Sequence, residues 1–113
     1  MKCYRCQKEI TDLKMAMIFW KEVEAEGGQR VYEDFEICHK PCKPRERWEM
    51  CWELDWFMTD RQVLEWLSTI IPRAVSTVSG GGARVHESLV KVIIDLSRYV
   101  IKGEPSREVV FER

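Results

Sequence analysis

The sequence predicts an α+β fold, and three observations lead to that prediction. Two short pairs of soft metal ligands, Cys3 with Cys6 and His39 with Cys42, lie well apart in the N-terminal half. The stretch between them has the apolar pattern and the glycine turn of a β-hairpin. The C-terminal half instead carries apolar residues at helical spacing. We therefore expect a metal-binding unit over residues 1–58 and a helical region over residues 59–113.

Composition limits the class of protein. The 113 residues are 45% hydrophobic and 33% charged, with a net charge of -1, which is typical of a soluble globular chain. This charge lacks the basic excess that non-specific phosphate binding requires. No stretch approaches the roughly 20 apolar residues of a membrane span, and the N-terminus has no apolar signal core. The odd count of five cysteines disfavours a disulfide framework. We expect a cytoplasmic protein that does not enter a membrane.

The predicted hairpin runs between the two ligand pairs. Residues 13–26 are mostly apolar, which suits a strand covered on both faces. Gly27 and Gly28 mark the turn, and the apolar positions of residues 31–37 mark the return strand. Those positions alternate imperfectly, which leaves the register of the second strand open.

A helix is expected directly after the second ligand pair, over residues 44–57. Pro44 suits a first helical turn, and Trp48, Trp52 and Trp56 recur every fourth residue. The tryptophan stripe could be an exposed binding platform, but it more commonly forms core. We read Cys51, beside it, as core as well.

Two or three further helices are predicted after residue 58. Thr59 and Gln62 match a capping box, and the helix that follows should end or kink at Pro72. Glycines 80–82 indicate a flexible connection. A third amphipathic helix is expected over residues 83–102, and its apolar face could form a homodimer. Residues 108–111 could add a short edge strand or stay loose.

The ligand pairs predict a structural zinc site. Zinc in such sites takes four Cys or His ligands, and two intervening residues let a tight turn direct both side chains to one ion. Cys3, Cys6, His39 and Cys42 would fill all four positions. Cys38 is the alternative to His39, since neighbouring residues of a strand point in different directions. A redox pair of Cys3 and Cys6 is disfavoured because no strand precedes it.

This order of knuckle, hairpin, second ligand pair and helix resembles the treble-clef zinc fold group. The ligand spacing is similar to the first half of a LIM domain, although the insert is longer and a second cysteine-rich half is missing. The resemblance covers residues 1–58. It implies binding of proteins or nucleic acids or, in some branches, phosphodiester cleavage.

The functional prediction is a small zinc-stabilised module that binds a protein partner. The alternative is a nucleic-acid-binding, transcription-related zinc protein that uses the basic residues near the second ligand pair. The candidate partner-binding residues are Lys43, Arg45, Arg47, Trp48 and Trp52. We expect no enzymatic activity, and a metal-dependent nuclease using His86 is the alternative. His86 is otherwise expected to be an exposed helix residue.

Overall fold

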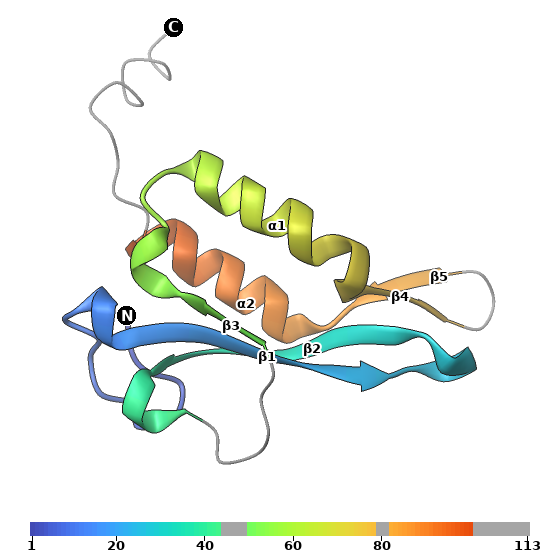
Figure 1. Ribbon diagram of the computed structural model, residues 1–113, viewed down its shortest axis with the longest axis horizontal. Helices are drawn as coiled ribbons and strands as arrows, with labels where there is room; N and C mark the ends of the chain where they lie inside the picture. Colours follow the sequence, from blue (N-terminus) through green and yellow to red (C-terminus); the bar gives the residue numbers. More distant parts are fainter. Residues whose placement is uncertain (44–49, 79–81, 101–113) are drawn as a thin grey trace, which may run out of the picture.

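The computed structural model describes residues 1–43, 50–78 and 82–100, and they form an α+β arrangement of one main sheet and two helices. The sheet contains β1 (Ala16–Glu24), β2 (Arg30–His39) and β3 (Met50–Glu53) in the order β2-β1-β3. Both pairings are antiparallel. The helices α1 (Asp60–Ala74) and α2 (Glu87–Asp95) lie on the same side of this sheet (Figure 1).

The predicted hairpin is present as β1 and β2. Gly27 and Gly28, with φ of 78° and 80°, form the turn in a backbone region that glycine enters without steric cost. The register shifts between Phe19 and Lys21, opposite Asp34, whose φ is 55°. This bulge explains the imperfect alternation of the return strand, because the extra residue changes which face the following side chains occupy.

The outer edge of β2 is covered by other parts of the chain. The amide of Phe35 donates to Ser88 Oγ at 2.8 Å, and the carbonyl of Ile37 accepts from the Tyr4 amide at 2.9 Å. The amide of His39 donates to Cys3 Sγ at 3.4 Å. These alternate residues direct their backbone groups away from β1, so α2 and the N-terminal segment satisfy polar groups that an edge strand would otherwise expose.

Helix α1 begins where the sequence places it. Thr59 accepts from the Gln62 amide, and the Gln62 side chain accepts from the Thr59 amide, which completes the predicted capping box. The helix continues two residues past Pro72 and ends at Ala74. Pro72 lies in the last turn as an exposed residue, so the helix ends two residues after the proline that was predicted to end or kink it.

The segment between the helices differs from the prediction. In place of an irregular connection, the chain forms β4 (Val75–Val78), which pairs with β5 (Gly82–Val85) as a second, two-stranded sheet. Gly82 is therefore the first residue of β5, and residues 79–81 are outside the described part. The third predicted helix is correspondingly shorter. It starts at Glu87 and continues from Leu96 to Val100 as a π-helical turn.

The helix predicted over residues 44–57 is wrong where the structure describes it. Residues Met50–Glu53 form β3, and Leu54–Trp56 form a single 3₁₀ turn. The pairing of Ile18 with Trp52 and of Phe19 with Cys51 provides β1 with a second neighbour. This long-range pairing outweighs the four-residue spacing of the tryptophans, which is a local signal.

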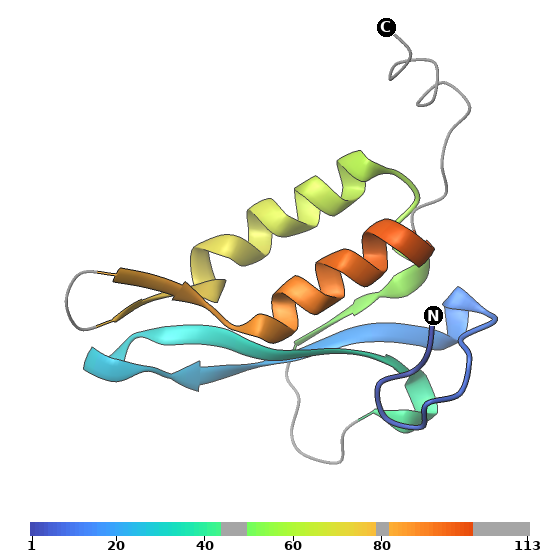
Figure 2. The same ribbon diagram turned by 180° about the vertical axis from the view of Figure 1, so that it is seen from behind.

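One continuous core joins the sheet to both helices. Trp66 of α1 is fully buried at its centre, with ring centroids 5.9 Å from Trp20, 6.1 Å from Phe35 and 5.7 Å from Phe57. Leu89, Val92, Leu96 and Val100 add the buried stripe of the C-terminal helical segment. Seen from behind, both helices again cover the sheet, and the N-terminal knuckle lies at one end of the hairpin (Figure 2). Within the described residues, no helix is long and apolar enough to cross a membrane.

Candidate metal centre

Three segments bring four soft ligands together. Cys3 and Cys6 come from the N-terminal knuckle, His39 ends β2, and Cys42 lies in a 3₁₀ turn formed by Lys40–Cys42. Each residue offers one ligand atom, and the four atoms lie within 4.8 Å of one another. The group could therefore hold a metal ion, as its spacing in the sequence predicts.

The knuckle is a tight backbone turn. The Gln7 amide donates to the Cys3 carbonyl, and the Cys3 amide donates to the Lys8 carbonyl, both at 3.0 Å. Gln7 has a φ of 64°, a left-handed conformation that directs the chain back on itself. This turn places the Cys6 amide 3.5 Å from Cys3 Sγ, so one ligand's backbone supports the other ligand's sulfur.

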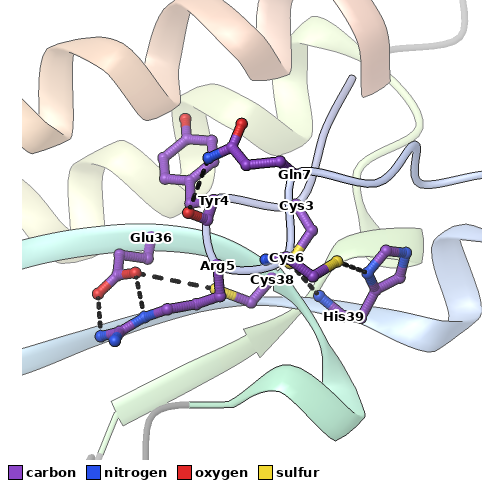
Figure 3. Close-up of polar contacts among 8 residues, drawn as sticks. All are labelled: Cys3, Tyr4, Arg5, Cys6, Gln7, Glu36, Cys38 and His39. Atoms are coloured by element: carbon purple, nitrogen blue, oxygen red, sulfur yellow. Dashed lines mark hydrogen bonds and ion pairs between the residues drawn. The ribbon is translucent and has the colours of Figure 1, made fainter.

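The spacing of one pair of ligand atoms suits binding to a shared metal ion. Cys6 Sγ lies 3.4 Å from His39 Nδ1. Zinc bonds of standard length meeting at the tetrahedral angle would place a sulfur and a nitrogen roughly 3.6 Å apart. Figure 3 shows the Cys6 sulfur and the His39 ring directed toward each other, with Cys3 beside them. The pair needs little movement to bind one ion.

The environment of Cys3 favours the thiolate that metals bind. Burial acts to raise its pKa, but backbone amides of Cys6, His39 and Arg5 surround the sulfur and outweigh that effect. Together they lower the pKa of Cys3 to about 6. Amide donors stabilise a sulfur anion as they do any buried anion. These amides therefore favour the anionic form of Cys3, which is the form that binds metal.

Cys38, the alternative ligand, lies outside this group of four. Its side chain is fully buried and its sulfur is 4.0 Å from Glu36 Oε1. Burial, and then the negative charges of Cys3 and Glu36, raise the pKa of the Cys38 thiol to about 12. The structure thus brings His39, and not Cys38, together with the other three ligands.

An ion pair fastens the knuckle to the hairpin. Arg5 Nε and Nη2 donate to the two carboxylate oxygens of Glu36 at 2.7 and 2.8 Å (Figure 3). Bidentate pairing fixes the relative orientation of the two groups as well as their separation. It aligns Cys3 and Cys6 with the end of β2.

The knuckle also reaches α2. Tyr4 donates its hydroxyl proton to Asp95, and the Lys91 ammonium lies 4.3 Å from the centre of the Tyr4 ring. A cavity of about 470 Å³ opens beside these contacts, between the knuckle and the helix. Burial, followed by the Asp95 hydrogen bond and charge, raises the pKa of Tyr4 and keeps its proton in place. No local pattern of residues indicates this contact, which joins residues far apart in the chain.

A second polar network, which His86 forms with Ser88 and Asp34, was also not predicted from the sequence. His86 caps α2, and its Nδ1 accepts from the Ser88 amide at 3.2 Å and lies 2.7 Å from Ser88 Oγ. Its Nε2 lies 3.4 Å from Asp34 Oδ1 in the β2 bulge. His86 is therefore a partly buried helix cap, contrary to the prediction of an exposed helix residue. A Ser two residues after a His at a strand-to-helix junction was the available signal.

Two of the five predicted partner-binding residues, Lys43 and Trp52, lie in the part of the chain that the structure describes. Trp52 is half-buried on β3, with its ring 5.1 Å from that of Trp56, and Lys43 is exposed. Arg45, Arg47 and Trp48 lie outside the described residues. Lys40, beside the second ligand pair, forms an ion pair with Glu53 at 2.9 Å. Cys51 is exposed on β3, so its prediction as core is wrong.

No family model, curated protein or solved structure matches this chain.

Proposed function

We propose that this chain is a small module that a structural zinc ion stabilises and that presents its helices to a protein partner. The observation that carries the zinc proposal is the approach of four Cys and His ligand atoms to within 4.8 Å of one another. Three thiolates and one imidazole suit zinc, which prefers sulfur and nitrogen at tetrahedral positions. The treble-clef resemblance remains part of this proposal.

The role of the ion is structural in this proposal. Four protein ligands complete the coordination of zinc and leave no position for a reacting water. The ion would join the first turn of the chain to the end of β2, which the Cys3 sulfur already contacts through the His39 amide. Metal binding would then contribute directly to the free energy of folding.

The helices supply the surface for a partner. On α1, Leu64 and Ile71 are 64% and 46% exposed, and on α2 Val90 and Ile94 are 51% and 44% exposed. Both helices lie on the same side of the sheet (Figure 1). Large apolar side chains exposed on neighbouring elements are characteristic of protein-binding surfaces. The partner could be a second copy of the chain, for which residues 83–102 were the predicted contact.

Chelation tests the zinc proposal. The reduced protein should contain one zinc per chain, and a strong chelator should remove the ion. Loss of the ion should lower the melting temperature sharply and reduce the ordered signal in circular dichroism, because the knuckle loses its link to the hairpin. A protein whose metal content is zero after expression in zinc-supplemented medium, or whose melting is unaffected by the chelator, would exclude a stabilising zinc.

Charge substitutions on the helices test the interaction proposal. Ile71→Glu and Val90→Glu should abolish co-purification of a specific partner, or self-association in sedimentation, while zinc content and melting stay unchanged. Lys14→Glu, at an exposed site outside both helices, is the matched control for added charge. If heparin or DNA retention is strong and the helix variants keep it, the nucleic-acid alternative replaces this proposal.

A further inference from the structure

A fourth cysteine lies against the candidate metal centre without belonging to it. Cys38 is in β2, and the Tyr4–Ile37 and His39–Cys3 hydrogen bonds place Cys3 alongside it. The negative charge of Cys3 is one of the causes that raise the pKa of the Cys38 thiol, which agrees with this proximity. Both residues are fully buried. Cys3 is therefore the thiol that these described contacts bring to Cys38.

The number of thiols matters for oxidation. A centre with three cysteines and one histidine forms a single disulfide when oxidised and leaves one cysteine without a partner. That unpaired thiolate would proceed to sulfinic acid, which cellular thiols do not reverse. Here Cys38 makes the number of neighbouring thiols even. The sulfurs of Cys3, Cys6 and Cys42 all lie within 4.8 Å of one another, so any two of them are close enough to pair. Pairing of Cys3 with Cys38 would leave Cys6 and Cys42 to pair with each other.

We propose that Cys38 is a resolving cysteine that makes oxidative release of zinc reversible, by forming a disulfide with Cys3. This inference rests on the proposed zinc site. Cys38 would play no part in holding the ion and would act only when the centre is oxidised.

The chemistry needs a hydroperoxide as oxidant. A thiolate attacks the peroxide O–O bond and becomes a sulfenic acid, and hydroxide leaves. The neighbouring thiol then attacks the sulfenic sulfur, the S–S bond forms, and water departs. Two hydroperoxide molecules thus convert four cysteines into two disulfides. The ligand sulfurs lose the lone pairs that bound the metal, and the ion leaves as hydrated Zn²⁺.

Exposure sets the order of the two steps. Cys6 and Cys42 are partly exposed, whereas Cys3 and Cys38 are fully buried. Peroxide should therefore oxidise the Cys6–Cys42 pair first. Loss of the ion then frees Cys3, which becomes accessible as the knuckle loosens, and Cys38 captures its sulfenic acid before a further peroxide reacts.

Disulfide mapping tests the proposal on the full chain. The zinc-loaded protein and the metal-free reduced protein are treated with hydrogen peroxide, and zinc release is followed with a chromogenic chelator. Remaining thiols are alkylated, and the digest is analysed by mass spectrometry. Trypsin cleavage after Arg5 separates Cys3 from Cys6, and fragmentation separates Cys38 from Cys42. We expect a Cys3–Cys38 cross-link in both samples, and recovery of most zinc after a dithiol is added.

Two substitutions sharpen the test. Cys38→Val fills the same buried space without a thiol, and it should lower the zinc recovered after reduction at least about two-fold because Cys3 is overoxidised. Cys51→Ser removes the exposed cysteine on β3 and should leave products and recovery unchanged. The proposal is wrong if Cys38 is fully alkylated in the oxidised chains, or if Cys38→Val recovers zinc as well as the native protein does.

These experiments distinguish a failure of this proposal from a failure of the zinc proposal on which it rests. Absence of zinc from the reduced native protein would overturn the proposed function, while cross-linking in the metal-free sample would still decide the pairing of Cys3 with Cys38. If Cys38→Val does not fold, the map of the native chain decides alone.

Discussion

The hydroxyl of Tyr4 donates a hydrogen bond to the carboxylate of Asp95, 91 residues further along the chain. Tyr4 lies inside the knuckle, between two candidate metal ligands, and Asp95 is the last residue of α2. This contact couples the two ends of the described chain. The metal centre and the helical layer are therefore expected to lose stability together.

Replacing Tyr4 with Phe should lower the free energy of unfolding by about 1–2 kcal/mol, because a partly buried hydrogen bond to a charged group is lost. Chemical denaturation of the zinc-loaded protein measures the loss. Tyr99→Phe, at a 57% exposed residue nearby, is the matched control and should change stability by less than about 0.5 kcal/mol. Equal effects of the two substitutions would show that the Asp95 contact adds nothing.

The same tyrosine predicts a pH dependence. Burial and Asp95 raise the pKa of Tyr4 in the folded protein, while the unfolded chain has the ordinary value of about 10. Above that pH the unfolded state binds fewer protons than the folded state, so stability falls as pH rises. Below it both states keep the proton, and the contribution is complete.

Comparison with Tyr4→Phe isolates this effect from other alkaline titrations. The stability advantage of the native protein should be constant up to about pH 9. It should then shrink by up to about 1.4 kcal/mol for each further pH unit. Denaturation midpoints of both proteins between pH 8 and 11 provide the measurement. An advantage that grows with pH would contradict the sign of the pKa shift.

A substitution at the aromatic centre of the core should lower the stability much more. Trp66 is fully buried among Trp20, Phe35 and Phe57, so Trp66→Ala should cost about 3–5 kcal/mol. Leu64→Ala, on the same helix at 64% exposure, should cost less than about 0.5 kcal/mol. Thermal unfolding of both variants checks the difference. A small loss for Trp66→Ala would mean that the helical layer is not part of the same cooperative core.

The sequence predicted those features that local chemistry determines. The two residues between the ligands of each pair set the ligand geometry within one turn of backbone, and the structure brings the four ligands together. The capping box of Thr59 and Gln62 is equally local, and it is present. Residues Met50–Glu53 are different, because their pairing with β1 depends on a partner some thirty residues away. The tryptophan spacing suggested a helix there, but pairing with β1 in the sheet outweighs this local preference.

A second difference had a signal that was misread. The glycines at 80–82 were interpreted as a linker, yet the β-branched residues Val75, Thr77 and Val78 precede them and Val85 follows them. Strand-forming residues on both sides of glycines favour a hairpin. The contacts of His86 with Asp34 and of Tyr4 with Asp95, in contrast, depend on how α2 packs against β2 and the knuckle. No spacing in the sequence encodes them.

Gln7 provides the last prediction, since it lies in a conformation that suits glycine. Its φ of 64° costs a residue with a side chain about 1–2 kcal/mol, and its side chain donates only one exposed hydrogen bond, to the Tyr4 carbonyl at 3.2 Å. Glycine has no such cost but loses more backbone entropy on folding, which offsets part of the gain. Gln7→Gly should therefore raise the free energy of unfolding by about 0.5–1 kcal/mol in the zinc-loaded protein. Lys8→Gly is the matched control, because Lys8 does not have a positive φ, and it should lower stability by a similar amount. If both glycines destabilise the protein equally, the knuckle does not hold the left-handed turn that brings Cys6 to Cys3.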